Sequence, residues 1–184
     1  MKRVLFAAGA VWLAAVTGVG QTPAPSGPPP QRASSPGPAG EVLGTYNRLK
    51  PNVIKAAEEM PDAEYQFKPT PEIRTYARIV NHVTEAQQHT CSALNGTTFE
   101  AKTVPSDTAD KATIVAGLRA SFDVCDKAYG ALTDASIAEL VDAGRSKRSR
   151  IGMAWGNVSH DNEQYAELST YLRLKGLVPP TAEK

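Results

Sequence analysis

The sequence is poor in the residues from which redox centres, metal clusters and nucleic-acid surfaces are built. Its 184 residues include two cysteines and three histidines, and the formal net charge is +1. Cys91 and Cys125 do not form a Cys-x-x-Cys motif, which argues against a redox-active pair. A charge this close to neutral provides little attraction for nucleic acid. We therefore expect neither a thiol redox protein nor a nucleic-acid-binding protein.

Long hydrophobic runs are also scarce, and the one at the start of the chain covers Val4–Val16. It is shorter than the roughly 20 apolar residues that cross a bilayer. Basic Lys2 and Arg3 precede it and small residues follow it up to Gly20, which predicts a signal peptide over residues 1–20. A retained membrane anchor is the alternative, and the absence of a cysteine directly after the run argues against a lipoprotein. We expect a periplasmic or secreted protein with no stable membrane insertion after cleavage.

The composition changes twice along the rest of the chain. Residues 21–40 are dominated by Pro, Gly, Ser and Ala, which predicts a disordered linker. Residues 41–180 have the composition of a globular domain and are long enough for one domain with one core. In an oxidising compartment Cys91 and Cys125 could form a disulfide, and a pair of buried thiols is the alternative.

Apolar residues recur at helical spacing in four segments of this domain, and no strand pattern competes with them. Pro51 predicts a kink or break near Lys50. Trp155 is expected to face the core, and residues 134–150, which include a basic run, are expected to form a solvated surface loop. Four amphipathic helices in succession predict an all-α four-helix bundle. The expected helices cover residues 41–59, 75–94, 107–133 and 151–175.

The histidines supply the candidate site residues. His82 and His89 lie on the expected second helix, whereas His160 lies on the fourth, one turn before Gln164 on the same face. A catalytic metal site needs three protein ligands and one open position, and bundles build such sites from facing helices. His89 lies about 10 Å beyond His82 along the helix, too far to share an ion with it. A metal-free core or surface role is the usual alternative for such histidines.

Two neighbouring acidic residues are not expected to join this site. Asp161 and Glu163 point to other faces of the helix than His160, so both are predicted to be exposed charges. The sequence also offers no identifiable nucleophile or acid–base pair. The catalytic residues are therefore left unassigned.

Several sequence motifs resemble those of the DinB/YfiT-like superfamily of metalloenzymes, and more narrowly its small secreted bacterial branch. The resemblance spans residues 41–180, and its most distinctive part is the end of the domain. The motifs are Ala-Ala-Glu-Glu-Met-Pro at 56–61, Tyr-Gln-Phe-Lys-Pro-Thr-Pro-Glu at 65–72, Asn-His-Val at 81–83, His-Asp-Asn-Glu-Gln-Tyr at 160–165 and Tyr-Leu-Arg-Leu-Lys-Gly-Leu-Val-Pro-Pro at 171–180. The resemblance implies a four-helix bundle that binds a divalent metal, often Zn²⁺ or Ni²⁺.

In that family one histidine of the second helix and a His-x-x-x-His pair of the fourth bind the metal. His82 and His160 match two of these ligands, while Gln164 stands where the pattern has the third histidine. An amide oxygen is a weaker donor than imidazole for such ions. The resemblance therefore implies a site of His82, His160 and Gln164 in which Gln164 weakens the binding of Zn²⁺ or Ni²⁺.

Two functions follow as alternatives. Relatives in the superfamily include thiol-dependent transferases, so one is a metal-dependent transferase or hydrolase-type enzyme. The usual low-molecular-weight thiols are cytosolic, which argues against a transferase outside the cell membrane. The other is a non-catalytic, ligand-binding or stress-related bundle with a degenerate, metal-free site. The partner we expect in either case is a small molecule, and both are compatible with a homodimer.

Overall fold

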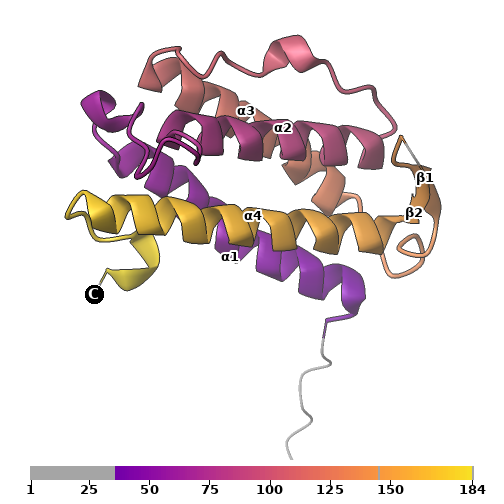
Figure 1. The fold of residues 1–184 in the computed structure, drawn as a ribbon. Helices are drawn as coiled ribbons and strands as arrows, with labels where there is room; N and C mark the ends of the chain where they lie inside the picture. Colours follow the sequence, from indigo (N-terminus) through magenta and orange to yellow (C-terminus); the bar gives the residue numbers. More distant parts are fainter. Residues whose placement is uncertain (1–35, 145, 184) are drawn as a thin grey trace, which may run out of the picture. The chain divides into compact units, whose positions relative to one another are not determined.

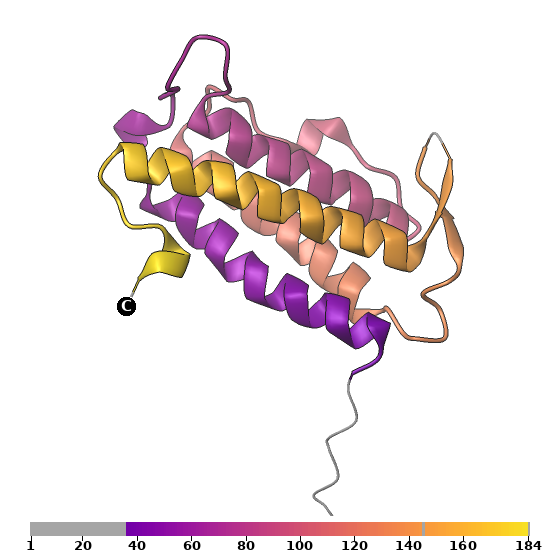
Figure 2. The same ribbon diagram turned by 60° about the horizontal axis from the view of Figure 1, so that its bottom comes forward.

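Four long helices pack as a bundle in the computed structural model, which describes residues 36–144 and 146–183 (Figures 1 and 2). Helix α2 packs against α3 and α4, and α1 packs against α4 and α3. The predicted all-α four-helix bundle is therefore confirmed. The helices are α1 (Pro38–Glu59), α2 (Tyr76–Leu94), α3 (Lys111–Gly130) and α4 (Arg150–Leu174), with short 3-10 turns η1 (Asp62–Glu64), η2 (Ala101–Thr103) and η3 (Pro180–Ala182).

The expected signal peptide and most of the expected linker lie outside the described residues. Within residues 36–144 and 146–183, no helix is both long enough and apolar enough to cross a bilayer. Helix α1 begins at Pro38, so the last residues assigned to the linker are helical. The carboxylate of Asp134 accepts a hydrogen bond from the Ala39 backbone N–H at 2.9 Å, which supplies one of the partners that the first turn of a helix needs.

Three helices begin at a side-chain cap. The oxygens of Thr75, Asp110 and Ser149 accept from the backbone N–H three residues later, at 3.2, 2.7 and 3.2 Å. Helix α3 therefore starts at Lys111 rather than at Asp107. The carboxylate of Asp107 instead accepts from the amide of Asn81 at 2.8 Å and ties the preceding loop to α2.

Two expectations about local structure are wrong, and a third is wrong in part. The break predicted near Lys50 does not occur: helix α1 runs unbroken through the exposed Pro51, beside which the Asn52 side chain donates to the Arg48 carbonyl at 3.0 Å. Residues 134–150 contain an antiparallel hairpin whose strands are too short for an alternating pattern to show. Trp155 is 40% exposed, because the adjacent Ala154 takes the inward position. The strands are β1 (Leu140–Asp142) and β2 (Lys147–Ser149).

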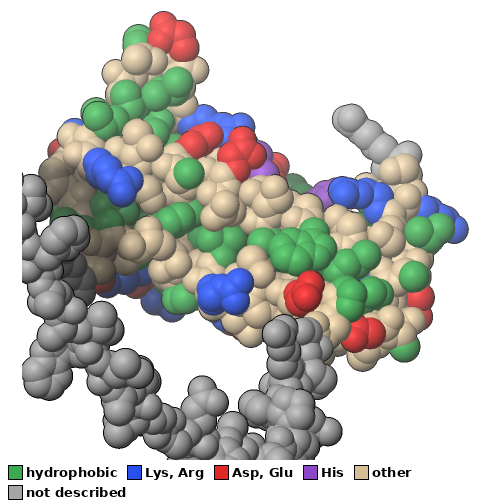
Figure 3. Space-filling model, turned by 90° about the horizontal axis from the view of Figure 1, so that it is seen from below, with side chains coloured by type: hydrophobic (Ala, Val, Ile, Leu, Met, Phe, Trp, Pro, Cys, Tyr) green, Lys and Arg blue, Asp and Glu red, His purple; other side chains and the backbone are tan. Residues whose placement is uncertain are grey.

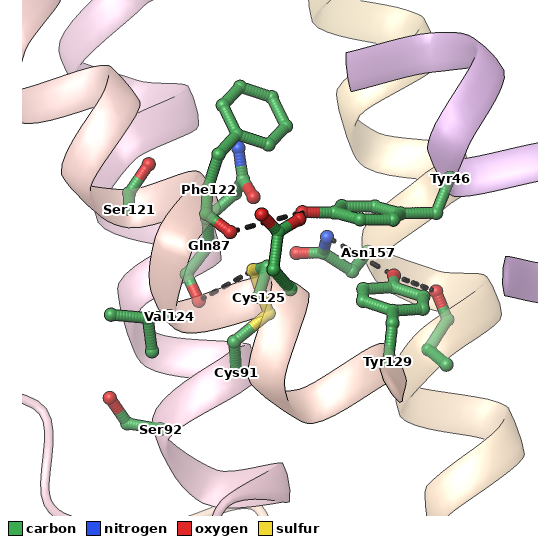
Figure 4. Close-up of a disulfide and its surroundings, with 12 residues drawn as sticks. Tyr46, Gln87, Cys91, Ser92, Ser121, Phe122, Val124, Cys125, Tyr129 and Asn157 are labelled. Atoms are coloured by element: carbon green, nitrogen blue, oxygen red, sulfur yellow. Dashed lines mark hydrogen bonds between the residues drawn. A yellow bond between two sulfur atoms is a disulfide. The ribbon is translucent and has the colours of Figure 1, made fainter. Parts of the chain in front are cut away.

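A disulfide between Cys91 and Cys125 joins α2 to α3 (Figure 4). Both side chains are fully buried, and their Cα atoms lie 5.0 Å apart. The sequence left a disulfide and two buried thiols as alternatives, and the structure has the disulfide. It closes a loop of 34 residues, for which a chain-entropy account predicts a stabilisation of about 4 kcal/mol.

Buried tyrosines fill the core beside the disulfide. The rings of Tyr46 and Tyr129 stack with centroids 4.1 Å apart and join α1 to α3. The Tyr46 hydroxyl donates to Asp126 at 2.7 Å, and the Tyr129 hydroxyl donates to the Ala154 carbonyl at 2.8 Å. Burial raises the pKa of both phenols far above their ordinary value, so they remain neutral donors. These bonds fix α1, α3 and α4 around the core and hold the α4 residues of the candidate site in register.

Candidate functional site

The packing of α2 against α4 brings His82 and His160 together. Their Nε2 atoms are 3.1 Å apart, and the ring centroids lie 4.9 Å apart with an interplanar angle of 71°. Both side chains are about one quarter exposed, at 26% and 27%. The two histidines proposed from the sequence as partners across the bundle therefore point their ring edges at each other.

A carboxylate lies beside the other nitrogen of each ring. The Asp161 Oδ1 atom is 3.5 Å from His160 Nδ1, and the Glu85 Oε2 atom is 4.0 Å from His82 Nδ1. The hydrogen bond with Asp161 favours a proton on His160 Nδ1, whereas His82 Nδ1 has no hydrogen-bond partner among the described residues. His82 can therefore carry its proton on Nε2 and donate it to the lone pair of His160 Nε2 across 3.1 Å. When both rings carry their protons on Nδ1, the two Nε2 lone pairs face one point and can bind a metal ion there.

His82 stays neutral more readily than an ordinary histidine. Burial lowers its pKa, and the nearby Arg74 guanidinium and the His160 ring lower it further. Only the neutral ring offers an Nε2 lone pair to a ligand. His82 is therefore ready to act as a ligand at neutral pH.

Asp161 is 1% exposed, so the prediction that it is an exposed helix charge is wrong. The Asn157 amide, one turn earlier on α4, donates to Asp161 Oδ2 at 3.2 Å. Burial raises the pKa of Asp161 to about 6, although its hydrogen bonds with His160 and Asn157 act in the opposite direction. Glu163 is exposed, as predicted. Asp161 therefore orients the His160 ring from the buried side, away from solvent.

The third predicted site residue, Gln164, is 2% exposed and lies beside Arg74. Its Oε1 atom accepts a hydrogen bond from Arg74 Nη1 at 3.4 Å. Arg74 is held in place because its backbone carbonyl accepts from the Tyr171 hydroxyl at 2.6 Å. The amide oxygen that would face a metal is thus already shared with a cationic group. The guanidinium charge opposes the binding of a second cation, although solvent screens this repulsion at an exposed side chain.

His89 does not join the pair, in agreement with the distance argument from the sequence. Its ring instead lies edge-on to Phe99, with centroids 6.1 Å apart. Two hollows flank the His82–His160 pair. We call them the Arg74 cavity, of about 610 Å³, and the hairpin groove, of about 440 Å³. The Arg74 cavity includes Glu72, Glu163, Gln164 and Glu167, and the hairpin groove includes His89, Phe99, Arg148 and Met153.

The donor geometry can be compared with the needs of a metal ion. Two nitrogens about 2.0–2.1 Å from one ion lie roughly 3.0–3.4 Å apart, so the Nε2 pair has the right separation. Within residues 36–144 and 146–183, no group of three or more His, Cys, Asp and Glu side chains is placed to hold an ion. The residues present therefore suit a site with two imidazole ligands, a weak amide donor and several positions open to water or a ligand.

Comparison with known proteins agrees with this architecture. Residues 45–168 match the family model of the DinB superfamily. The chain belongs to the DinB superfamily. The DinB fold also recurs in solved structures. A DinB-like protein from Bacillus cereus is 20% identical with a TM-score of 0.64, and the match covers 76% of this chain and 93% of that one.

Two other solved structures share the fold at lower identity. A conserved protein from Enterococcus faecalis is 15% identical with a TM-score of 0.60, covering 74% of this chain and 95% of that one. A DinB-like protein from Bacillus subtilis is 13% identical with a TM-score of 0.58, covering 74% and 92%. At these identities the likeness concerns the fold alone. No curated protein matches the chain.

Sequence reasoning missed Arg74 and the buried partners of His160 in this DinB domain. Arg74 precedes α2 and reaches the site only through tertiary packing, so no local pattern marks it. Asn157 and Asp161 carried a signal, because they are polar residues spaced four apart with the apolar Tyr165 on the same face. A polar pair on a buried stripe predicts a buried network, and such networks often support a site.

Proposed function

We propose that this DinB-domain protein binds a divalent metal ion, Zn²⁺ or Ni²⁺, through the Nε2 atoms of His82 and His160. The observation that carries the proposal is the 3.1 Å separation of these atoms, with Asp161 hydrogen-bonded to Nδ1 of His160. This arrangement aims two lone pairs at one point and leaves coordination positions open. A bound ion would supply Lewis acidity and would lower the pKa of a coordinated water or thiol.

The affinity is expected to be low. An amide oxygen replaces the third imidazole, and that oxygen accepts from Arg74. Even a lost outer-shell partner typically costs about 10–100-fold in metal affinity, and a weakened first ligand costs more. We propose that a small-molecule ligand completes the coordination shell, so that metal and ligand bind together.

A metal-dependent transferase or hydrolase-type activity is one use of such a site. The contact between Arg74 and Gln164 favours a second candidate, a metal-free bundle that binds a small molecule without catalysis. In that case the two Nε2 atoms share a hydrogen bond instead of a metal ion. The two candidates differ in whether metal enters the site when it is supplied.

We also propose that the protein works in the periplasm or outside the cell. The buried disulfide between Cys91 and Cys125 supports this location, because such bonds persist in oxidising compartments. The basic and apolar start of the chain supports it independently.

Elemental analysis after equilibration with Zn²⁺ or Ni²⁺ tests the metal proposal. Wild-type protein should retain up to one ion per chain when the free ion is in the micromolar range or above. His82→Ala and His160→Ala should each lose it, whereas His89→Ala should retain it. Equal retention by all four proteins, or none by the wild type, would support the metal-free candidate.

A further inference from the structure

The hairpin groove has a distinct chemical character that the metal proposal leaves unused. It runs between α2 and α4 from the His82–His160 pair to the β2 strand, and all three histidines of the chain line it. Phe99 and the buried Met153 provide an apolar wall. Arg148, which belongs to strand β2 of the hairpin, also lines the groove.

The Arg148 side chain lies against two glycines of α4, Gly152 and Gly156. Its Nη2 atom donates to the Gly152 carbonyl at 3.0 Å. A Cβ atom at Gly156 would meet Nη2 at 3.5 Å, so the guanidinium lies directly against the backbone there. Gly156 precedes His160 by four residues, which is about 6 Å along the helix. The guanidinium and the histidine pair therefore lie about one helical turn apart on the same side of α4.

Arg148 also has no acidic partner among residues 36–144 and 146–183. Its neighbour Arg150 is paired with Glu139 at 2.9 Å, whereas the hydrogen bond of the Arg148 side chain is to the neutral Gly152 carbonyl. A guanidinium has five N–H donors in a planar fork that matches a carboxylate. Most of these donors remain free for a ligand.

The charges on the two sides of the histidine pair differ in sign. In the Arg74 cavity three carboxylates, those of Glu72, Glu163 and Glu167, outnumber one guanidinium. In the hairpin groove the one carboxylate, Glu85, is paired with Arg78 at 3.2 Å, which leaves the charge of Arg148 in excess. Along the edge of the face in Figure 3, acidic side chains and a basic one lie on one side of the visible histidine atoms, and basic ones lie on the other. An anionic ligand would therefore enter the hairpin groove.

We propose that the hairpin groove is a binding site for a small carboxylate-bearing molecule with a short apolar body. The carboxylate pairs with Arg148, the apolar body contacts Phe99 and Met153, and the far end reaches the histidine pair. This assignment deepens the proposed function, because it names the class of molecule that would complete the metal site. Only the contact with the histidines depends on metal.

The test uses 3-phenylpropanoate as the probe on protein stripped of metal with a chelator. Binding is followed by the NMR shift of the Met153 methyl group, with the fully buried Met60 as an internal reference. Wild-type protein should show a saturable Met153 shift. Arg148→Ala should weaken binding about tenfold or more, as expected for the loss of a charge-assisted pair. The neutral amide of the probe should bind about as weakly to the wild type.

Lys147→Ala is the matched control, because it removes the same charge from the adjacent strand position, whose side chain points to the other face. It should bind the probe like the wild type. Equal affinity in Arg148→Ala, equal binding of the amide, or no Met153 shift would overturn the assignment. Since metal is absent, these failures leave the metal proposal standing. Conversely, probe binding by a protein that never takes up Zn²⁺ or Ni²⁺ would leave the groove assignment standing alone.

Discussion

The Nε2 atom of His82 lies 3.1 Å from the Nε2 atom of His160, and each ring has a carboxylate beside its Nδ1 atom. This relationship joins the middle of α2 to the middle of α4. It creates a point where two neutral imidazoles can either share a hydrogen bond or bind one metal ion. The predictions on metal binding depend on it.

The third ligand position is best tested by replacing Gln164 with histidine, because Gln164→Glu would alter the charge as well as the type of donor atom. Gln164→His supplies a third imidazole on the same face as His160, so we expect Zn²⁺ affinity to rise about tenfold or more. Isothermal titration calorimetry measures the change. Asn162→His adds an imidazole at an exposed position outside both hollows that flank the histidine pair and should leave the affinity nearly unchanged. An equal gain in both variants would contradict the placement of Gln164.

Arg74→Gln should raise the pKa of His82 and strengthen metal binding. The Arg74 charge disfavours a second positive charge nearby and is one of the causes that lower this pKa. An NMR titration of the His82 ring measures the pKa, and the same protein can be titrated with Zn²⁺. Arg173→Gln removes an exposed cation at the end of α4 and is the control. No rise in the pKa of His82 would show that solvent screens Arg74 completely.

The double variant Cys91→Ala/Cys125→Ala should lose about 2–5 kcal/mol of unfolding free energy, since the disulfide closes a loop of 34 residues. Urea denaturation measures the loss. Both cysteines lie on the α2–α3 side of the bundle, away from the α2–α4 contact that holds the histidines. Metal and probe binding by the folded variant should therefore match the wild type. Lost binding under conditions where the variant is folded would show that the disulfide positions the site.

Asp110 provides a pH dependence with a defined sign. The Thr113 backbone N–H and hydroxyl donate to its carboxylate and lower its pKa. A carboxylate with a lowered pKa stabilises the fold above its unfolded value of about 3.9, and this contribution is lost as the pH falls through the folded value. Asp110→Asn keeps a good N-cap without the charge. The stability difference between wild type and Asp110→Asn should be constant above about pH 5 and shrink on acidification. A difference that grows in acid would contradict the cap.

The sequence predicted the features that follow from periodicity. The four helices, the inward stripes and the approach of His82 to His160 depend on repeats of 3.6 residues and on how amphipathic helices associate. The sequence did not predict features that depend on a few residues or on packing between distant segments. The β1–β2 hairpin has strands of three residues, and Trp155 lies one position away from the inward face.

Asp161 shows the limit of local reasoning most clearly. Its position relative to His160 correctly placed it on another face of α4. That face is buried rather than exposed to solvent, and the Asn157 amide donates a hydrogen bond to the Asp161 carboxylate there. Which non-ligand face is buried depends on where α1 and α3 pack. The hydrophobic pattern of α4 specifies this poorly, because polar residues interrupt it.

The most direct test of the two-histidine metal site is a Zn²⁺ titration followed by the ¹⁵N shifts of the histidine rings. The account predicts that, without metal, Nδ1 of His160 carries a proton beside Asp161. With Zn²⁺, the Nε2 resonances of both rings should move together while His89 stays unchanged. Coordination through Nδ1, a shift in one ring alone, or no shift at saturating Zn²⁺ would contradict it.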